Sequence, residues 1–177
     1  MNNKIAKQSR VQSLLLRKAN IEEQDVMLIW EALSLYIRDE MSKKVGVNVT
    51  GFGTFTYVET HLDIGNNKEI VKLRPAFILS DKFCKKHSLE YEKEYINESI
   101  PVKIINYVTI RQMAKCKYSR EIIELVLNEA FTAMDHFIRM ESNISIPFNG
   151  LGVFKVVNVN AKPKRIAGFE FSSAMAK

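Results

Sequence analysis

The side chains in this sequence that are best suited to chemistry are clusters of lysine and arginine. One cluster flanks a glycine-containing stretch in the first half, a second follows Ser80-Asp81, and a third surrounds Pro163 near the end. Grouped cations attract phosphates, carboxylates and other anionic surfaces. We therefore predict that these clusters contact a partner; their residues are Lys68, Lys72, Arg74, Lys82, Lys85, Lys86, Lys155, Lys162, Lys164 and Arg165.

Residues that could catalyse a reaction or hold a metal are few and far apart. The histidines and cysteines are His61, His87, His136, Cys84 and Cys116. The cysteines form neither a CxxC pair nor a metal-ligand cluster with the histidines, so we expect two unreactive thiols. Gly51 and Gly53 lack the third glycine and the following helix of a nucleotide-binding loop. We expect a protein that is not an enzyme and that holds no cofactor or metal.

The overall composition indicates a folded protein with an acidic partner. The 177 residues have a formal net charge of +6, with 46% hydrophobic and 26% charged residues. Such a balance is typical of folded domains, and the positive charge favours nucleic acid, an anionic membrane or an acidic cytoskeletal polymer. Because no apolar run approaches the ~18 residues of a membrane span and no secretory signal is visible, we expect an intracellular protein without a membrane partner.

An internal repeat organises the chain. In residues 45–55, apolar side chains alternate with other residues and lead into Gly51-Phe52-Gly53. Residues 144–154 repeat the pattern and lead into Gly150-Leu151-Gly152. Period-two alternation is typical of a strand with one buried face, and paired glycines permit a tight turn. We predict a β-hairpin in each half that turns at these glycines.

Helical patterns precede each hairpin. Apolar residues at spacings of three and four predict long helices through residues 26–37 and 123–138. Shorter helices are predicted over residues 5–19 and 108–115. Ser119 is a suitable N-cap for the second long helix.

The two copies differ after their hairpins. In the first, Ser80 is placed to cap a short helix that ends at His87. In the second, residues 169–177 suffice for a single helical turn. Between the copies, the acidic residues 90–98 lead into Ile100-Pro101 and predict a linker.

The order helix, helix, hairpin and short helix resembles the HU/IHF fold of bacterial DNA-bending proteins. More closely, the sequence resembles the eukaryotic tandem-HU family of coiled-coil domain-containing protein 81. The resemblance covers essentially the whole chain, although the second half matches mainly through its strand pattern, and no coiled-coil pattern follows it. The motifs that carry the resemblance are Trp30, Gly46-Val47, Gly51-Phe52-Gly53-Thr54-Phe55, Gly65-Asn66-Asn67-Lys68 and Arg74-Pro75-Ala76-Phe77.

The resemblance implies an α+β fold of two tandem HU/IHF-like domains, each with a helical pair and a small sheet that extends into an arm. We place domain 1 at residues 1–89, a linker at 90–101, and domain 2 at 102–177 with a truncated last helix. HU domains pair, and two copies on one chain have a high effective concentration for each other. We expect an intramolecular pseudo-dimer; the alternative is open chains in which each half pairs with a neighbouring molecule.

The hairpin arms do not match the requirements of a symmetric DNA clamp. HU-like arms enter the minor groove, contact phosphates with basic residues and wedge a proline between base steps. Residues 56–73 have two lysines against three carboxylates, a formal charge of −1, and no proline at the tip. Residues 154–171 have a formal charge of +3, with Pro163 at the expected turn. The second arm alone is suited to a polyanion.

The resemblance also implies a cellular setting, because the tandem-HU family is associated with centrosomes and cilia. We therefore expect a structural protein of a ciliary (axonemal) or centriolar microtubule assembly, in the cytoplasm and cytoskeleton, with tubulin or another scaffold protein as its partner. An alternative is an HU-like protein that binds nucleic acid, either inside an organelle or elsewhere in the cell. A third possibility is an adaptor with no affinity for polyanions.

Overall fold

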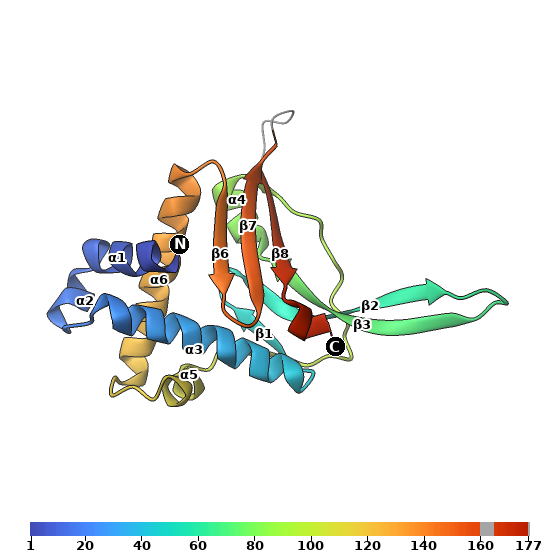
Figure 1. The fold of residues 1–177 in the computed structure, drawn as a ribbon, viewed down its shortest axis with the longest axis horizontal. Helices are drawn as coiled ribbons and strands as arrows, with labels where there is room; N and C mark the ends of the chain where they lie inside the picture. Colours follow the sequence, from blue (N-terminus) through green and yellow to red (C-terminus); the bar gives the residue numbers. More distant parts are fainter. Residues whose placement is uncertain (160–164, 177) are drawn as a thin grey trace.

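Each half of the chain folds into helices followed by a hairpin sheet, as the repeat predicts (Figure 1). The structure is a computed structural model and describes residues 1–159 and 165–176. In the first half the elements are helices α1 (Asn2–Gln12), α2 (Leu14–Lys18) and α3 (Glu23–Ser42), strands β1 (Gly46–Val49), β2 (Gly53–Asp63) and β3 (Glu69–Leu79), helix α4 (Asp81–His87) and strand β4 (Leu89–Glu90).

The second half repeats this order with a shorter first helix and shorter arm strands. A single 3-10 turn stands where the first half has α4, as the few remaining residues suggested. The elements are strand β5 (Val102–Ile104), helices α5 (Tyr107–Ala114) and α6 (Arg120–Met140), strands β6 (Ile144–Phe148), β7 (Gly152–Asn158) and β8 (Arg165–Phe171), and the turn η1 (Ser173–Ala176).

The two halves exchange strands. The first sheet has the order β3-β2-β1-β5 and the second β4-β8-β7-β6, so each sheet takes one short strand from across the linker. β5 pairs in parallel with β1, and β4 pairs in parallel with β8. The structure therefore forms the expected pseudo-dimer within one chain, rather than leaving each half to pair with a neighbouring molecule.

Side chains satisfy free backbone N–H groups at the starts of α2, α3, α5 and α6. Ser80 occupies the predicted N-cap position of α4 but makes no side-chain cap hydrogen bond within the described residues. A reciprocal capping box of Glu22 and Asp25 starts α3, and Ser119 accepts a hydrogen bond from Ile122 N–H at the start of α6. The prediction of one helix over residues 5–19 is wrong in detail. Ser13 takes an extended conformation and its hydroxyl caps α2, because serine competes well for backbone N–H groups at such positions.

One hydrophobic core joins the two halves. Trp30 is 3% exposed, and the centroid of its ring lies 5.2 Å from that of Phe131 in the second half. Phe52 lies in the first glycine turn. Its ring centroid is 5.3 Å from that of Phe131 and 5.1 Å from that of Phe154. Aromatic rings at such separations contribute beyond the area they bury, so these contacts stabilise the pairing of the halves.

The first glycine turn is needed on steric grounds. A Cβ at Gly53 would lie 2.5 Å from the Phe77 ring and 2.7 Å from the carbonyl oxygen of Ile78. The glycine therefore lets β3 approach β2 at the point where the hairpin leaves the core, and positions the arm that β2 and β3 build.

Candidate functional site

The first arm is a long two-stranded ribbon that projects from the body of the molecule (Figure 1). β2 and β3 pair without interruption from Gly53 opposite Leu79 to Asp63 opposite Glu69. The tip turns through Gly65, Asn66 and Asn67, all with positive φ, and the Asp63 carboxylate accepts a hydrogen bond of 2.8 Å from Gly65 N–H. Asparagine tolerates this backbone region better than most residues, which explains the tip sequence.

The charges of the first arm separate by face. Residues directly opposite each other in an antiparallel pair share a face, and alternate residues change face. Lys72 lies opposite Thr60 and Ile70 opposite Leu62, whereas Glu69 lies opposite Asp63. We call Leu62, Ile64, Lys68, Ile70 and Lys72 the lysine face, and Glu59, His61, Asp63, Glu69, Val71 and Leu73 the carboxylate face.

Each face also exposes apolar side chains. On the lysine face, Leu62 and Ile70 are 43% and 38% exposed, and on the carboxylate face Val71 is 52% exposed. Lys68 and Lys72 are exposed and have no ion-pair partner within the described residues. On the opposite face, the His61 ring lies between carboxylates, 2.9 Å from Glu69 and 3.4 Å from Glu59. The formal charge of −1 thus conceals a cationic face and an anionic face.

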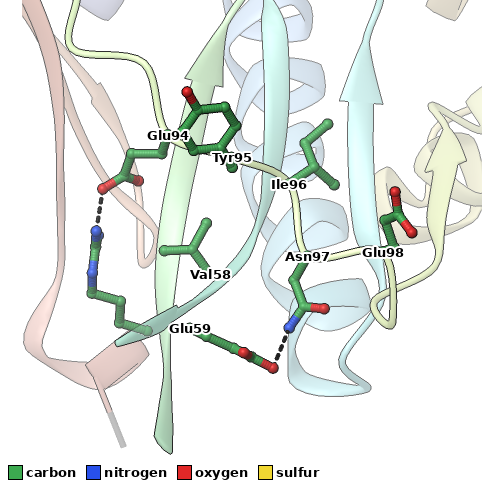
Figure 2. Close-up of a pocket in the computed structure, with 8 residues that line it drawn as sticks. Val58, Glu59, Glu94, Tyr95, Ile96, Asn97 and Glu98 are labelled. Carbon is green, nitrogen blue, oxygen red and sulfur yellow. Dashed lines mark hydrogen bonds and ion pairs between the residues drawn. The ribbon is translucent and has the colours of Figure 1, made fainter. Parts of the chain in front are cut away.

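The linker crosses the base of this arm and holds the third predicted cation, Arg74. The guanidinium pairs with the Glu94 carboxylate and donates to the Thr60 hydroxyl at 3.0 Å. Asn97 donates to Glu59 at 3.0 Å, as Figure 2 shows. Arg74 is therefore tied to its own chain, whereas no described residue forms an ion pair with Lys68 or Lys72.

A cleft of about 480 Å³ lies between the arm base and the linker (Figure 2). Tyr95 on its rim is 93% exposed. The carboxylates of Glu59, Glu94 and Glu98 also line it, so this cleft is acidic and differs in charge from the lysine face.

In the described part of the second arm, Lys155 and Arg165 bond within the chain. Lys155 pairs with Glu170 across the ladder at 2.7 Å. Arg165 donates to the backbone carbonyls of Ile138 and Glu141, the latter at 3.2 Å, and so caps the C-terminal end of α6. The predicted contact residues Lys162 and Lys164, with Pro163, lie outside the described residues.

The cluster on α4 lies where the two halves meet. Lys82 and Lys85 are exposed, whereas Lys86 pairs with Asp135 of α6. A cleft of about 330 Å³ runs beside them, with Lys82 and Lys86 on one side and Asn128 and Asp135 on the other.

The buried neighbour of this cluster is His87, which sequence reasoning missed as a structural residue. Its side chain is 0% exposed, and Nε2 lies 2.8 Å from the Asp135 carboxylate. Burial raises the pKa of Asp135, but hydrogen bonds from His87 and Lys86 outweigh it and hold the pKa below its ordinary value. An acidic residue beside the apolar stripe of α6 was the available signal in the sequence.

Nothing in residues 1–159 and 165–176 groups histidine, cysteine and acidic side chains in a way that could hold a metal ion. Cys84 and Cys116 are both free thiols, and burial raises the pKa of Cys84, which makes it less reactive. The same residues contain no helix with the length and apolar character that a membrane crossing requires.

Two family models match the chain in tandem. Residues 3–91 match the CCDC81 eukaryotic HU domain 1, and residues 101–175 match the CCDC81 eukaryotic HU domain 2. The matches follow the order of the two halves seen in the structure, and the linker lies between them. With its strand-exchanged pair of HU-like halves and both domain models matched in sequence, the chain belongs to the CCDC81 eukaryotic HU-domain family.

Proposed function

We propose that this protein is a non-enzymatic structural component of a ciliary or centriolar microtubule assembly, and that it binds protein partners through its HU-like domains. The observation that carries the proposal is the first arm, where exposed apolar side chains accompany lysines that have no partner in the described residues. Aromatic and aliphatic anchors surrounded by polar groups are typical of protein interfaces. The setting rests on the family and on a net charge of +6, which suits the acidic surface of tubulin.

The arrangement of the arms argues against DNA bending as the main function. Arg74, Lys155 and Arg165 already have intramolecular partners, which reduces the cations available to phosphates. Strands β2 and β3 also extend in a different direction from strands β7 and β8 (Figure 1), whereas a clamp needs both arms on one duplex.

The test is co-sedimentation of the purified full chain with microtubules at about 150 mM salt, where weak surface attraction is screened. We expect wild type to pellet with microtubules. Lys68→Glu/Lys72→Glu should pellet less, and the matched control Asp63→Asn/Glu69→Gln, on the opposite face, should not.

A gel shift with nicked duplex DNA at the same salt decides the nucleic-acid alternative. DNA binding would show a steep salt dependence and would weaken in Lys162→Glu/Lys164→Glu, which leaves the capping residue Arg165 unchanged. A salt-sensitive DNA complex together with no microtubule binding would overturn the proposal.

A further inference from the structure

The first arm has an open backbone edge, and the hydrogen-bond register shows which residues form it. Ile64 N–H donates to Lys68 O at one end of the ladder, and Ser80 N–H donates to Phe52 O at the other. The register between them is continuous, so even-numbered residues of β3 bond to β2. Odd-numbered residues, including Glu69, Val71 and Leu73, therefore direct their N–H and C=O groups away from β2.

This edge is available because β3 is the last strand of its sheet. No further backbone hydrogen bond in the described part of the chain involves Glu69, Val71 or Leu73. Toward the body, Pro75 has no N–H to offer, and the Tyr91 side chain hydrogen-bonds to the backbone of Leu79. The open edge is thus bounded by Pro75 on one side and by the tip turn on the other.

The side chains on this edge favour pairing over protection. Exposed edges are usually guarded by charged residues. Among residues whose backbone groups face outward, Glu59, His61 and Asp63 of β2 follow that rule, whereas β3 has Glu69 and then the apolar Val71 and Leu73, 52% and 41% exposed. Ile70, 38% exposed, and Lys72 alternate with them on the opposite face. An added strand would cover these apolar residues on both faces of the ribbon at once, which docking on a single face would not.

We propose that the edge of β3 at Glu69–Leu73 accepts an extended segment of a partner protein as an additional strand. Side chains of the added strand would alternate between the two faces of the arm. Those on the lysine face would lie beside Lys68 and Lys72 and be acidic, and those on the carboxylate face would lie beside Val71 and Leu73 and be apolar. The inference rests on the proposed function as a protein-binding scaffold and names the surface and the partner chemistry.

The experiment measures fluorescence anisotropy of labelled ten-residue peptides with the full chain. The first peptide alternates glutamate with valine, the second alternates lysine with valine, and the third contains the glutamates and valines in blocks rather than in alternation. We expect the first peptide to bind at least about tenfold more tightly than either of the others, because it alone combines the alternation with the complementary charge.

Two test variants and one control locate the site. Val71→Pro removes one outward N–H group and leaves the ladder to β2 intact, and it should weaken the first peptide by at least about tenfold. Val71→Ala is its matched control, keeps the N–H group and should bind several-fold more tightly than Val71→Pro. Lys68→Glu/Lys72→Glu should reverse the preference between the first two peptides without any change to the backbone.

Equal binding of all three peptides, or unchanged binding by both Val71→Pro and the lysine variant, would overturn the inference. Analytical ultracentrifugation provides a further check. If the wild-type protein forms a dimer, binds no peptide, and is dissociated into monomers by Val71→Pro, then a second copy occupies the edge and the partner inference fails. Microtubule pelleting stays a separate readout. Peptide binding without pelleting rejects the microtubule assignment alone. Pelleting that Val71→Pro leaves unchanged shows that microtubules bind elsewhere than the edge.

Discussion

The two halves begin from the same pattern and differ most at their arms and last helices. The first half extends 11-residue strands into a ribbon with exposed apolar residues, and it ends in a seven-residue helix packed on the other half. The second half has seven-residue strands, uses Arg165 to cap a helix, and ends in one 3-10 turn. One copy of the repeat thus uses an arm cation in a structural contact, while the other extends an exposed ribbon.

The largest expected effect distinguishes the two glycine turns. Phe52 and Leu151 occupy the same place in the repeat and are both buried, but the Phe52 ring contacts aromatic rings from both halves. Phe52→Ala should lower the free energy of unfolding by about 3–5 kcal/mol, and Leu151→Ala by about 2–3 kcal/mol. Urea denaturation measures both, and an equal or larger cost at Leu151 would contradict a core centred on Phe52.

The next effect tests how α4 is anchored to the second half. Asp135→Asn should cost about 2–3 kcal/mol at pH 7, because the variant loses charged hydrogen bonds to His87 and Lys86 in a largely buried site. The folded-state pKa of Asp135 is lowered, so its stabilisation is present above the ordinary pKa of 3.8 and is lost as the pH falls through the folded pKa. The difference between variant and wild type should shrink accordingly.

Asp81 provides the control for this pH dependence. Asp81 lies on α4, the helix that Asp135 of α6 anchors, and its pKa is also lowered, by the exposed ion pair with Lys93. Asp81→Asn should have a smaller effect on the urea midpoint because solvent screens the pair. A larger effect at Asp81 than at Asp135 would show that the buried contact does not anchor α4.

A third effect compares one arginine from each arm. Arg165→Ala should cost about 1–3 kcal/mol, because it leaves carbonyls at the end of α6 without their donor. Arg74→Ala removes a half-exposed pair with Glu94 and should cost less than about 1 kcal/mol. Thermal unfolding of both variants decides the order, and a reversed order would assign the structural arginine to the first arm.

The smallest effect concerns the first arm tip. Asn67 has φ of +57°, which alanine tolerates less well. Asn67→Ala should change global unfolding by less than about 0.5 kcal/mol and should increase amide exchange within the arm, because the tip lies far from the core. Asn67→Gly is the matched control and should leave exchange near the wild-type rate. A large drop in global stability would mean that the arm packs more tightly than its exposure indicates.

The sequence predicted the fold well because its signals are local. Alternation before each glycine pair indicated the hairpins, three-and-four spacing indicated α3 and α6, and a serine indicated the α6 cap. The break at Ser13 was missed, since the apolar spacing continues through it. The sequence predicted only the total charge of the first arm. The separation of that charge into two faces needed the register between β2 and β3.

The candidate site was less predictable, because composition does not show which lysines and arginines already bond to other residues of the chain. Lys68 and Lys72 look like Arg74 and Arg165 in sequence, yet the latter two bond to residues 20 and 24–27 positions away. The buried contact between His87 and Asp135 spans 48 positions and has no local pattern.

The sequence by itself determined the repeat, the hairpins, the long helices and the net charge, because each depends on neighbouring residues. The tertiary structure decided the strand exchange, the capping role of Arg165, the two-faced arm and the open edge of β3. These features depend on which distant segments meet and in what register, and that is set by packing of the whole core rather than by any one segment.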